Sequence, residues 1–216
     1  MHCLAPKIAL FGATGMIGQR ILAEALSRGH EVTAIVRDPS RLNTEHERLH
    51  AVVGDIFDEN KVAQAVRGHD VVISAFGPKA GEEKTLIEAT RSLINGVKQS
   101  GVDRLVAVGG AGSLEVAPGV QLVDTPDFPD FIKPIALAHR DALNIYLQEK
   151  ELNWTNASPA AMIAPGERTG TYRTDTDRLV VDENGESRIS AEDFAVAILD
   201  EAENPRFSRM RFTVGY

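Results

Sequence analysis

Cysteine, tryptophan and long apolar runs are nearly absent from this chain of 216 residues, which contains one cysteine, Cys3, and one tryptophan. A single cysteine excludes an internal disulfide framework and points to a reducing compartment, the cytoplasm. No apolar run approaches the length of a membrane span, and the first residues lack the charged-then-apolar order of a signal peptide. No spacing of histidine, cysteine and carboxylate residues indicates a metal site. We therefore expect a cytoplasmic protein with no membrane segment and no bound metal.

Positively charged residues are also fewer than negatively charged ones. The chain has 23 lysines and arginines and 31 aspartates and glutamates, which gives a formal net charge of −8. This balance argues against nucleic acids and anionic membranes as partners. The hydrophobic share of 43% and the charged share of 25% are those of an ordinary globular protein, and the length suits one domain over residues 1–216. We expect a small-molecule partner, a monomer or homodimer, and locally placed cations wherever a phosphate binds.

What the chain does contain is a glycine-punctuated stretch near its start, Lys7–Gly18 (KIALFGATGMIG). The apolar run Ile8–Phe11 predicts a buried strand, and the apolar spacing that follows the glycines predicts an amphipathic helix. A strand, a glycine turn and a helix form the arrangement that holds a dinucleotide pyrophosphate, because the free amides and the dipole of the helix start bind the anion. A tight turn without a ligand is the alternative. We predict cofactor contacts from Gly12, Thr14, Gly15, Met16, Ile17 and Gly18.

The second predicted strand, residues 31–36, ends on Arg37, which lies 19 residues beyond Gly18. This is where the fold places the residue that meets the adenosine ribose. An acidic residue there would bind the ribose of NAD, whereas an arginine followed by Ser40 and Arg41 suits a phosphate monoester. We therefore predict NADP(H) in preference to NAD(H), with contacts from all three residues. Asp38 leaves open the alternative that an acidic side chain takes the ribose.

Further apolar runs predict strands near residues 50–54, 70–75, 104–108 and 153–158, and helical patterns alternate with them. Such alternation predicts an α/β fold, a Rossmann-like, doubly wound parallel sheet in a three-layer α/β/α domain, whose ligands bind at the carboxyl ends of the strands. Asp55, after the third strand, either meets the adenine edge or serves as a polar turn residue. Further predicted cofactor contacts are Asp55, Ile56, Ala75, Phe76, Gly77, Gly110, Ala111, Ser158 and Pro159.

Two segments without clear periodicity, residues 110–133 and 159–188, are predicted to form the two walls of the substrate side, because long irregular loops in a compact domain are usually functional. The dipeptide Asn184-Gly185 in the second segment predicts a hairpin. Arg168 and Tyr172 in the same segment either bind an anionic or aromatic acceptor or are ordinary loop residues.

Six segments of the sequence carry a resemblance to a known family. They are GATGMIG (12–18), VRDPSRL (36–42), VVGDIFD (52–58), AVGGAGSLEVAPG (107–119), WTNASPAAMIAPGERTGTYR (154–173) and ISAEDFAVAILDE (189–201). With these segments the chain resembles the atypical short-chain dehydrogenase/reductase proteins, in particular the NAD(P)-binding group of NADH–flavin reductases and biliverdin IXβ (flavin) reductases. The resemblance covers nearly the whole chain. It implies a Rossmann-like domain, a reduced nicotinamide cofactor, and flavins or quinones as acceptors.

Typical short-chain dehydrogenases use a Tyr-x-x-x-Lys pair as acid, and Tyr146 and Lys150 have that spacing. We reject this pair, because Tyr146 lies about three turns, roughly 18 Å, along a helix that begins at the ligand edge. Ser113 is our candidate catalytic residue for a hydrogen bond near the reacting centre, although its hydroxyl could equally hold the glycine-rich loop. His139 is a second candidate acid, and a packing role is the more common one for a histidine with no other feature beside it.

The missing acid bears on the reaction. Reducing a carbonyl requires a proton for the forming alkoxide, so an ordinary alcohol dehydrogenase or a nucleotide-sugar epimerase is disfavoured. Hydride transfer to a flavin or quinone needs less, since the product anion is delocalised and solvent can protonate it. We predict an NADP(H)-dependent oxidoreductase that reduces a flavin, a quinone or a similar small aromatic acceptor. A non-catalytic NADP(H) sensor that acts through a protein partner is the alternative.

Overall fold

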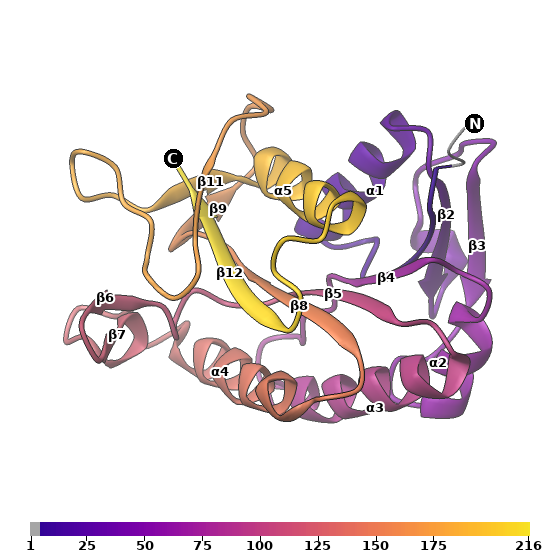
Figure 1. Ribbon diagram of the computed structural model, residues 1–216, viewed down its shortest axis with the longest axis horizontal. Coiled ribbons are helices and arrows are strands. Elements are labelled where there is room, and N and C mark those ends of the chain that lie inside the picture. The colour runs from indigo at the N-terminus through magenta and orange to yellow at the C-terminus, as the bar shows by residue number, and fades with distance from the viewer. Residues whose placement is uncertain (1–4) are drawn as a thin grey trace.

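An eight-stranded sheet forms the centre of the computed structural model, which describes residues 5–216; Cys3 lies outside them. The strand order is β10-β12-β8-β5-β4-β1-β2-β3, and every pairing is parallel except that of β10 with β12. Helices cover both faces (Figure 1). The order reverses between β1 and β4, which is the point where open α/β sheets bind ligands. The predicted Rossmann-like, doubly wound fold is thereby confirmed.

The main elements have the following bounds. The sheet contains β1 (Lys7–Phe11), β2 (Glu31–Val36), β3 (Leu49–Val53), β4 (Val71–Ser74), β5 (Arg104–Val108), β8 (Asn153–Ser158), β10 (Arg173–Asp175) and β12 (Met210–Gly215), and the helices are α1 (Met16–Ser27), α2 (Glu59–Val66), α3 (Thr85–Ser100), α4 (Lys133–Gln148) and α5 (Ala191–Glu203).

The core consists of two apolar layers, one on each face of the sheet. Helices α1 and α5 pack together on one face, and α2, α3 and α4 follow one another across the other (Figure 1). Alternate side chains of β1 enter opposite layers: Ile8 and Leu10 lie with Phe194 on the α1–α5 face, and Ala9 lies with Trp154 on the α2–α4 face. Because both faces are buried, the strands read as unbroken apolar runs, which is why they were visible in the sequence.

The two predicted substrate-side segments contain more regular structure than expected and are joined to each other. Residues 110–133 include the hairpin of β6 (Glu115–Ala117) and β7 (Val120–Gln121). The backbone N–H of Glu115 donates to Asp177 at 2.8 Å, and the N–H of Leu179 donates back to Glu115 at 3.0 Å. Instead of two separate walls, this part of the molecule has one wall made from both segments.

The hairpin predicted at Asn184-Gly185 is wrong, although a turn is present. The N–H of Asp182 donates to the carbonyl of Glu186 at 2.8 Å, so the chain reverses there. The strands on either side belong to different sheets, because β10 pairs with β12 whereas β11 (Arg188–Ser190) pairs with β9 (Met162–Ala164). Local turn chemistry predicted the reversal correctly, and tertiary pairing decided which strands it connects.

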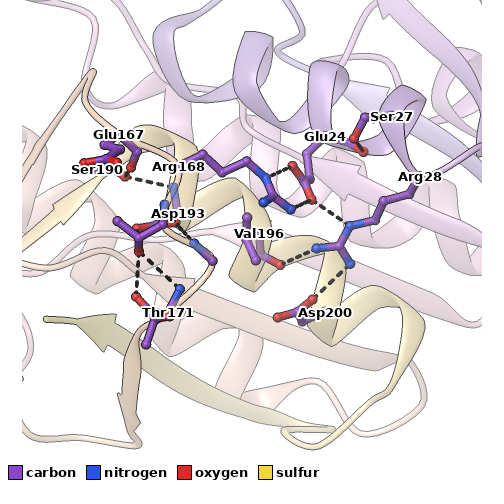
Figure 2. Close-up of polar contacts among 12 residues, drawn as sticks. Glu24, Ser27, Arg28, Glu167, Arg168, Thr171, Ser190, Asp193, Val196 and Asp200 are labelled. Atoms are coloured by element: carbon purple, nitrogen blue, oxygen red, sulfur yellow. Dashed lines mark hydrogen bonds and ion pairs between the residues drawn. The ribbon is translucent and has the colours of Figure 1, made fainter.

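Glu24 of α1 is the centre of a charged network that ties α1 to α5 and to the loop after β9 (Figure 2). Its side chain is 6% exposed and accepts two hydrogen bonds from Arg168 and one from Arg28, each at 2.8 Å. Arg28 also pairs with Asp200 at 2.9 Å and with Glu203 at 3.0 Å. The hydrogen bonds from Arg168, together with those from Arg28, lower the pKa of Glu24 to about 2 from the ordinary 4.5 despite its burial.

Asp193 of α5 fastens the same loop. The carboxylate is fully buried and accepts the backbone N–H groups of Thr169 at 2.9 Å and Gly170 at 2.8 Å, as well as the hydroxyl of Thr169 at 2.6 Å. The hydroxyl of Tyr172 donates to Asp200, also on α5, at 2.5 Å. The loop is therefore fixed along its length to the α1–α5 layer.

Replacing Glu24 tests the energetic role of this network. The pKa of Glu24 is about 2 in the folded chain, against an ordinary value of 4.5 that applies to the unfolded chain. The ionised carboxylate therefore stabilises the fold above about pH 4.5, and this stabilisation is lost as the pH falls towards 2. We expect Glu24→Gln to lower the free energy of unfolding at pH 7 by roughly 2–3 kcal/mol, and by less at pH 3. Urea unfolding at both pH values measures the difference. The control is Glu47→Gln, at a side chain that is 81% exposed, and it is expected to lower the free energy of unfolding by under about 0.5 kcal/mol. Equal losses of stability in the two variants would contradict the role of the network.

Candidate functional site

A cleft of about 420 Å³ lies at the carboxyl edge of the sheet, over the ends of β1, β2, β3 and β4. Its volume is that of a small-molecule site. The segments that line it are far apart in the sequence, and the sheet brings them together because each follows a parallel strand. The predicted cofactor residues that line the cleft are Gly12, Thr14, Gly15, Arg37, Arg41, Ile56, Ala75, Phe76 and Gly77.

The glycine turn between β1 and α1 has no room for side chains at two of its three glycines. Gly12 has φ +79°, and a Cβ there would lie 2.5 Å from the carbonyl of Ala75. A Cβ on Gly18 would overlap the carbonyl oxygen of Gly12. Gly15 is different, because a Cβ there would meet only the oxygen of Gly12, at 3.7 Å. Two glycines are therefore required by the fold, whereas Gly15 leaves open space where a ligand would approach.

The N-terminus of α1 faces the cleft without a protein counter-charge. Gly15 is its N-cap residue and makes no side-chain cap bond, and the first turn contains no acidic residue. By contrast, Asp58 caps α2 and Ser190 caps α5. Uncapped N–H groups and the positive end of the helix dipole attract anions. Thr14 and Gly15 reach the cleft, and Met16, Ile17 and Gly18 form the first turn behind them.

Arg37 lies at the other end of the cleft and makes only weak contacts with the protein. Its guanidinium stands over the ring of Phe57 at 5.1 Å and is 3.5 Å from Asp55, and its side chain is 69% exposed. Asp55 accepts the backbone N–H of Phe57 at 2.9 Å, a contact typical of the turn role that was one of its two alternatives. Its contact with the adenine edge stays a prediction. Phe57, which lines the cleft, was missed by the sequence reasoning.

Asp38 and Ser40 bind each other. The hydroxyl and the N–H of Ser40 donate to one carboxylate oxygen of Asp38 at 2.6 and 3.0 Å, and the hydroxyl, more than the amide, lowers the pKa of Asp38. One carboxylate oxygen of Asp38 is thereby engaged, and the alternative prediction that Asp38 binds the ribose stays open. Arg41 lines the cleft and makes no ion pair within residues 5–216.

The end of β4 closes the cleft. Phe76 packs edge-on against Phe57 with their ring centroids 5.6 Å apart. Beyond Gly77, the cleft is bordered by Pro78, Lys79 and Glu82. Of these, Lys79 and Glu82 lie in the connection to α3 and were not predicted. The sequence contained one signal for these residues: charged side chains in a short connection that directly follows a strand at the ligand edge.

The structure places the remaining predicted residues outside the cleft. The hydroxyl of Ser113 is buried and accepts a hydrogen bond from Arg211 at 2.9 Å, and Ser158 lies 3.4 Å from the same guanidinium. Pro159 accepts a hydrogen bond from Thr213 at 3.4 Å. Gly110 abuts the side chain of His139, which a Cβ would approach to 2.9 Å, and Ala111 accepts the N–H of Leu114 at 3.0 Å. All of these residues follow β5 or β8, on the side of the cleft away from Arg37.

Neither Tyr146 nor His139 reaches the cleft. Tyr146 lies in the last turn of α4, buried against Trp154 with ring centroids 5.6 Å apart, and its burial raises the pKa of the phenol. His139 lines a small inner cavity of about 20 Å³, together with Asn156, and burial lowers its pKa to about 4. None of the three tyrosines of the chain lines the cleft. Arg168 and Tyr172, the other candidates, are engaged with Glu24 and Asp200, so their contacts are those of loop anchors.

Two general features bear on the kind of site. No three histidine, cysteine, aspartate or glutamate side chains among residues 5–216 gather as metal ligands would. None of the helices in that range is long and apolar enough to cross a bilayer.

Comparison with known proteins is consistent with this geometry. A family model described as NAD(P)H-binding matches residues 12–205. The uncharacterized protein YwnB of Bacillus subtilis is 42% identical over 96% of this chain and 97% of its own length. The structure of a proposed exported protein from Burkholderia pseudomallei has 54% identity and a TM-score of 0.90, over 98% of this chain and all of that one. A proposed NADH-flavin reductase from Streptococcus pneumoniae has 33% identity and a TM-score of 0.85, over 97% and 99% of the two chains. Since one relative is named for export, the cytoplasmic location stays a prediction.

Alanine substitutions distinguish Gly18, which has no room for a side chain, from Gly15, which has room. We expect Gly18→Ala to lower the free energy of unfolding by more than about 2 kcal/mol, because its Cβ overlaps backbone that cannot rotate away. Gly15→Ala is the matched control and is expected to change stability by under about 1 kcal/mol, since its φ of −76° suits any residue and its Cβ meets open space. Thermal and urea unfolding measure both. Comparable losses in the two variants would contradict the assignment.

Proposed function

The chain belongs to the NAD(P)H-binding family, in the atypical short-chain dehydrogenase/reductase group, and from this premise we propose that it is an NADP(H)-dependent oxidoreductase. The proposed reaction is hydride transfer from the nicotinamide to a flavin, a quinone or a similar conjugated acceptor. The observation that carries the proposal is the cleft itself. It combines an uncapped helix N-terminus at one end with an exposed arginine at the other.

The preference for NADP(H) rests on charge. In a chain of net charge −8, the adenosine end of the cleft is bordered by Arg37 and Arg41, and Asp38 is engaged by Ser40. A guanidinium that is held only by a ring face and a carboxylate at 3.5 Å retains donors for a phosphate. A 2′-phosphate would thus meet two cations, whereas one oxygen of Asp38, the acidic residue at that position, is already engaged by Ser40.

The residues without a place at the cleft support the proposed class of acceptor. None of the three tyrosines lines it, and burial of His139 favours the neutral imidazole, so neither residue type is placed as a strong acid. The cofactor supplies the hydride, and a delocalised acceptor can take its proton from solvent. The work left to the chain is to hold both partners and to exclude competing water. The name of the pneumococcal relative, an NADH-flavin reductase, supports the same class.

Turnover tests this proposal directly. We expect the purified protein to oxidise NADPH in the presence of FMN, riboflavin or a quinone, at a rate well above that without protein, and to prefer NADPH over NADH. The loss of NADPH absorbance measures the rate. Binding of NADPH without turnover by any acceptor in the panel would overturn the proposal and favour the sensor alternative.

Removal of Arg37 tests the cofactor preference. Arg37→Ala is expected to weaken NADPH binding by about 1–2 kcal/mol, or roughly 5- to 30-fold in Kd, while NADH binding changes little, because only NADPH carries the 2′-phosphate. Calorimetric titration of both cofactors measures the effect. Arg48→Ala, which removes the same charge away from the cleft, controls for the overall field. Equal affinity of the unaltered protein for the two cofactors would disprove the role of Arg37.

A further inference from the structure

We propose that Arg211 is a positioning residue that assembles the acceptor side of the site. The proposal rests on the proposed function, since it concerns the region where the acceptor would meet the nicotinamide. That region follows β5 and β8, beyond the end of the cleft that is closed by Phe76. Arg211 lies on the next strand, β12, and its side chain crosses β8 to reach the loop that follows β5.

The guanidinium of Arg211 holds three separate segments. It donates to the hydroxyl of Ser113 at 2.9 Å and to the carbonyl of Ser113 at 3.3 Å. It also lies 3.4 Å from the hydroxyl of Ser158, at the end of β8. Through two further contacts, at 3.1 and 3.3 Å, it binds the carboxylate of Asp177 in the second substrate-side segment. One buried cation therefore joins both predicted walls to the sheet.

Two sets of hydrogen bonds join the segments, and the contacts of Arg211 are the first. The second contact between them is the backbone pairing of Glu115 with the chain at Asp177 and Leu179. Asp177 takes part in both sets, through its carbonyl oxygen and through its carboxylate. The side chain and the backbone pairing therefore act at the same place, which we call the joint. A cavity of about 390 Å³, bordered by Ser113, Asp177 and Arg211, lies beside the joint. Loss of the guanidinium would leave the joint with backbone contacts alone.

The chemistry of arginine also orients the hydroxyl of Ser113. A guanidinium donates hydrogen bonds and accepts none. The oxygen of Ser113 is therefore the acceptor, and its own hydrogen remains free for another partner. Such a hydroxyl is a donor, which suits the carbonyl groups of a flavin or quinone. Arg211 would thus keep Ser113, the candidate catalytic residue, in its donor state.

A second buried arginine in the same sheet provides a matched comparison. The side chains of Arg104 and Arg211 are both 7% exposed, and each pairs with one carboxylate, Glu201 at 2.8 Å and Asp177 at 3.1 Å. Arg104 also donates to Thr155, within the sheet. It touches neither substrate-side segment. Removing either arginine leaves a buried carboxylate or hydroxyls without a partner, so both variants lose stability. Only the variant that lacks Arg211 loses the side-chain contacts between the two substrate-side segments.

The experiment compares Arg211→Met with Arg104→Met. For Arg211→Met we expect the KM for the flavin or quinone to rise about tenfold or more, with the Kd for NADPH unchanged, because a charge-assisted contact to the acceptor side is lost. Amide hydrogen exchange is expected to speed up in residues 110–121 and 174–180 together. Arg104→Met is expected to lower the melting temperature at least as much, without changing the KM or the exchange of these segments. Arg211→Lys, which keeps the charge, should recover part of the KM.

The other possible results also decide whether Arg211 is a positioning residue. If both methionine variants raise the KM equally, or if Arg211→Met leaves the exchange of both segments unchanged, Arg211 has no positioning role. If Arg211→Met does not fold, Asp177→Asn carries the test with the same readouts, since that side chain is 69% exposed and its loss spares the core. If the unaltered protein reduces no acceptor, the proposed function fails. The exchange data then decide the inference alone, and loosening of both segments in the Arg211 variant only would still support it.

Discussion

The close approach of backbone to backbone at Gly12 is the constraint on which the rest of the structure depends. Its carbonyl lies against the first turn of α1 at Gly18, and its Cα lies against the end of β4 at Ala75, with no space for a side chain in either direction. This contact allows α1 to begin directly above the point where the strand order reverses. The helix N-terminus consequently faces the cleft with its N–H groups open. A wider turn would move that positive end away from any ligand.

Some arginines of this acidic chain are engaged in ion pairs of the scaffold, whereas Arg37 at the cleft is not tightly paired. Several ion pairs serve the scaffold, since Arg28 links Glu24 of α1 to Asp200 of α5, and Arg104 of β5 pairs with Glu201 of α5. Removing one member of such a buried pair is costly, whereas its net contribution to stability is modest. Arg37 is the opposite case, because it is largely exposed and only loosely paired. An arginine left in that state keeps N–H donors that no group among residues 5–216 occupies, which suits the proposed phosphate contact.

The sequence predicted those parts of the molecule whose cause is local. The strands of the sheet, the glycine turn and the position of Arg37 follow from apolar runs, turn chemistry and spacing, and the cleft gathers nine of the predicted cofactor residues. The contacts on the proposed acceptor side were harder to predict because they join distant parts of the chain. Ser113 and Arg211 are 98 positions apart, and no periodicity links them. Phe57 and Glu82 were missed for a related reason, since their place at the cleft depends on how two connections fold over the edge.

This difference has a physical basis in how α/β sheets make sites. The cofactor end is built from strand ends and one helix start, so the fold itself supplies the geometry and a short motif encodes it. The proposed acceptor end consists of the two long segments that leave the sheet, and tertiary contacts at β12 and α5 hold them. On the proposed function, we expect changes in those contacts to alter the acceptor side without disturbing the glycine turn. The contacts of the two segments would then select the acceptor, whereas the glycine turn would hold the cofactor.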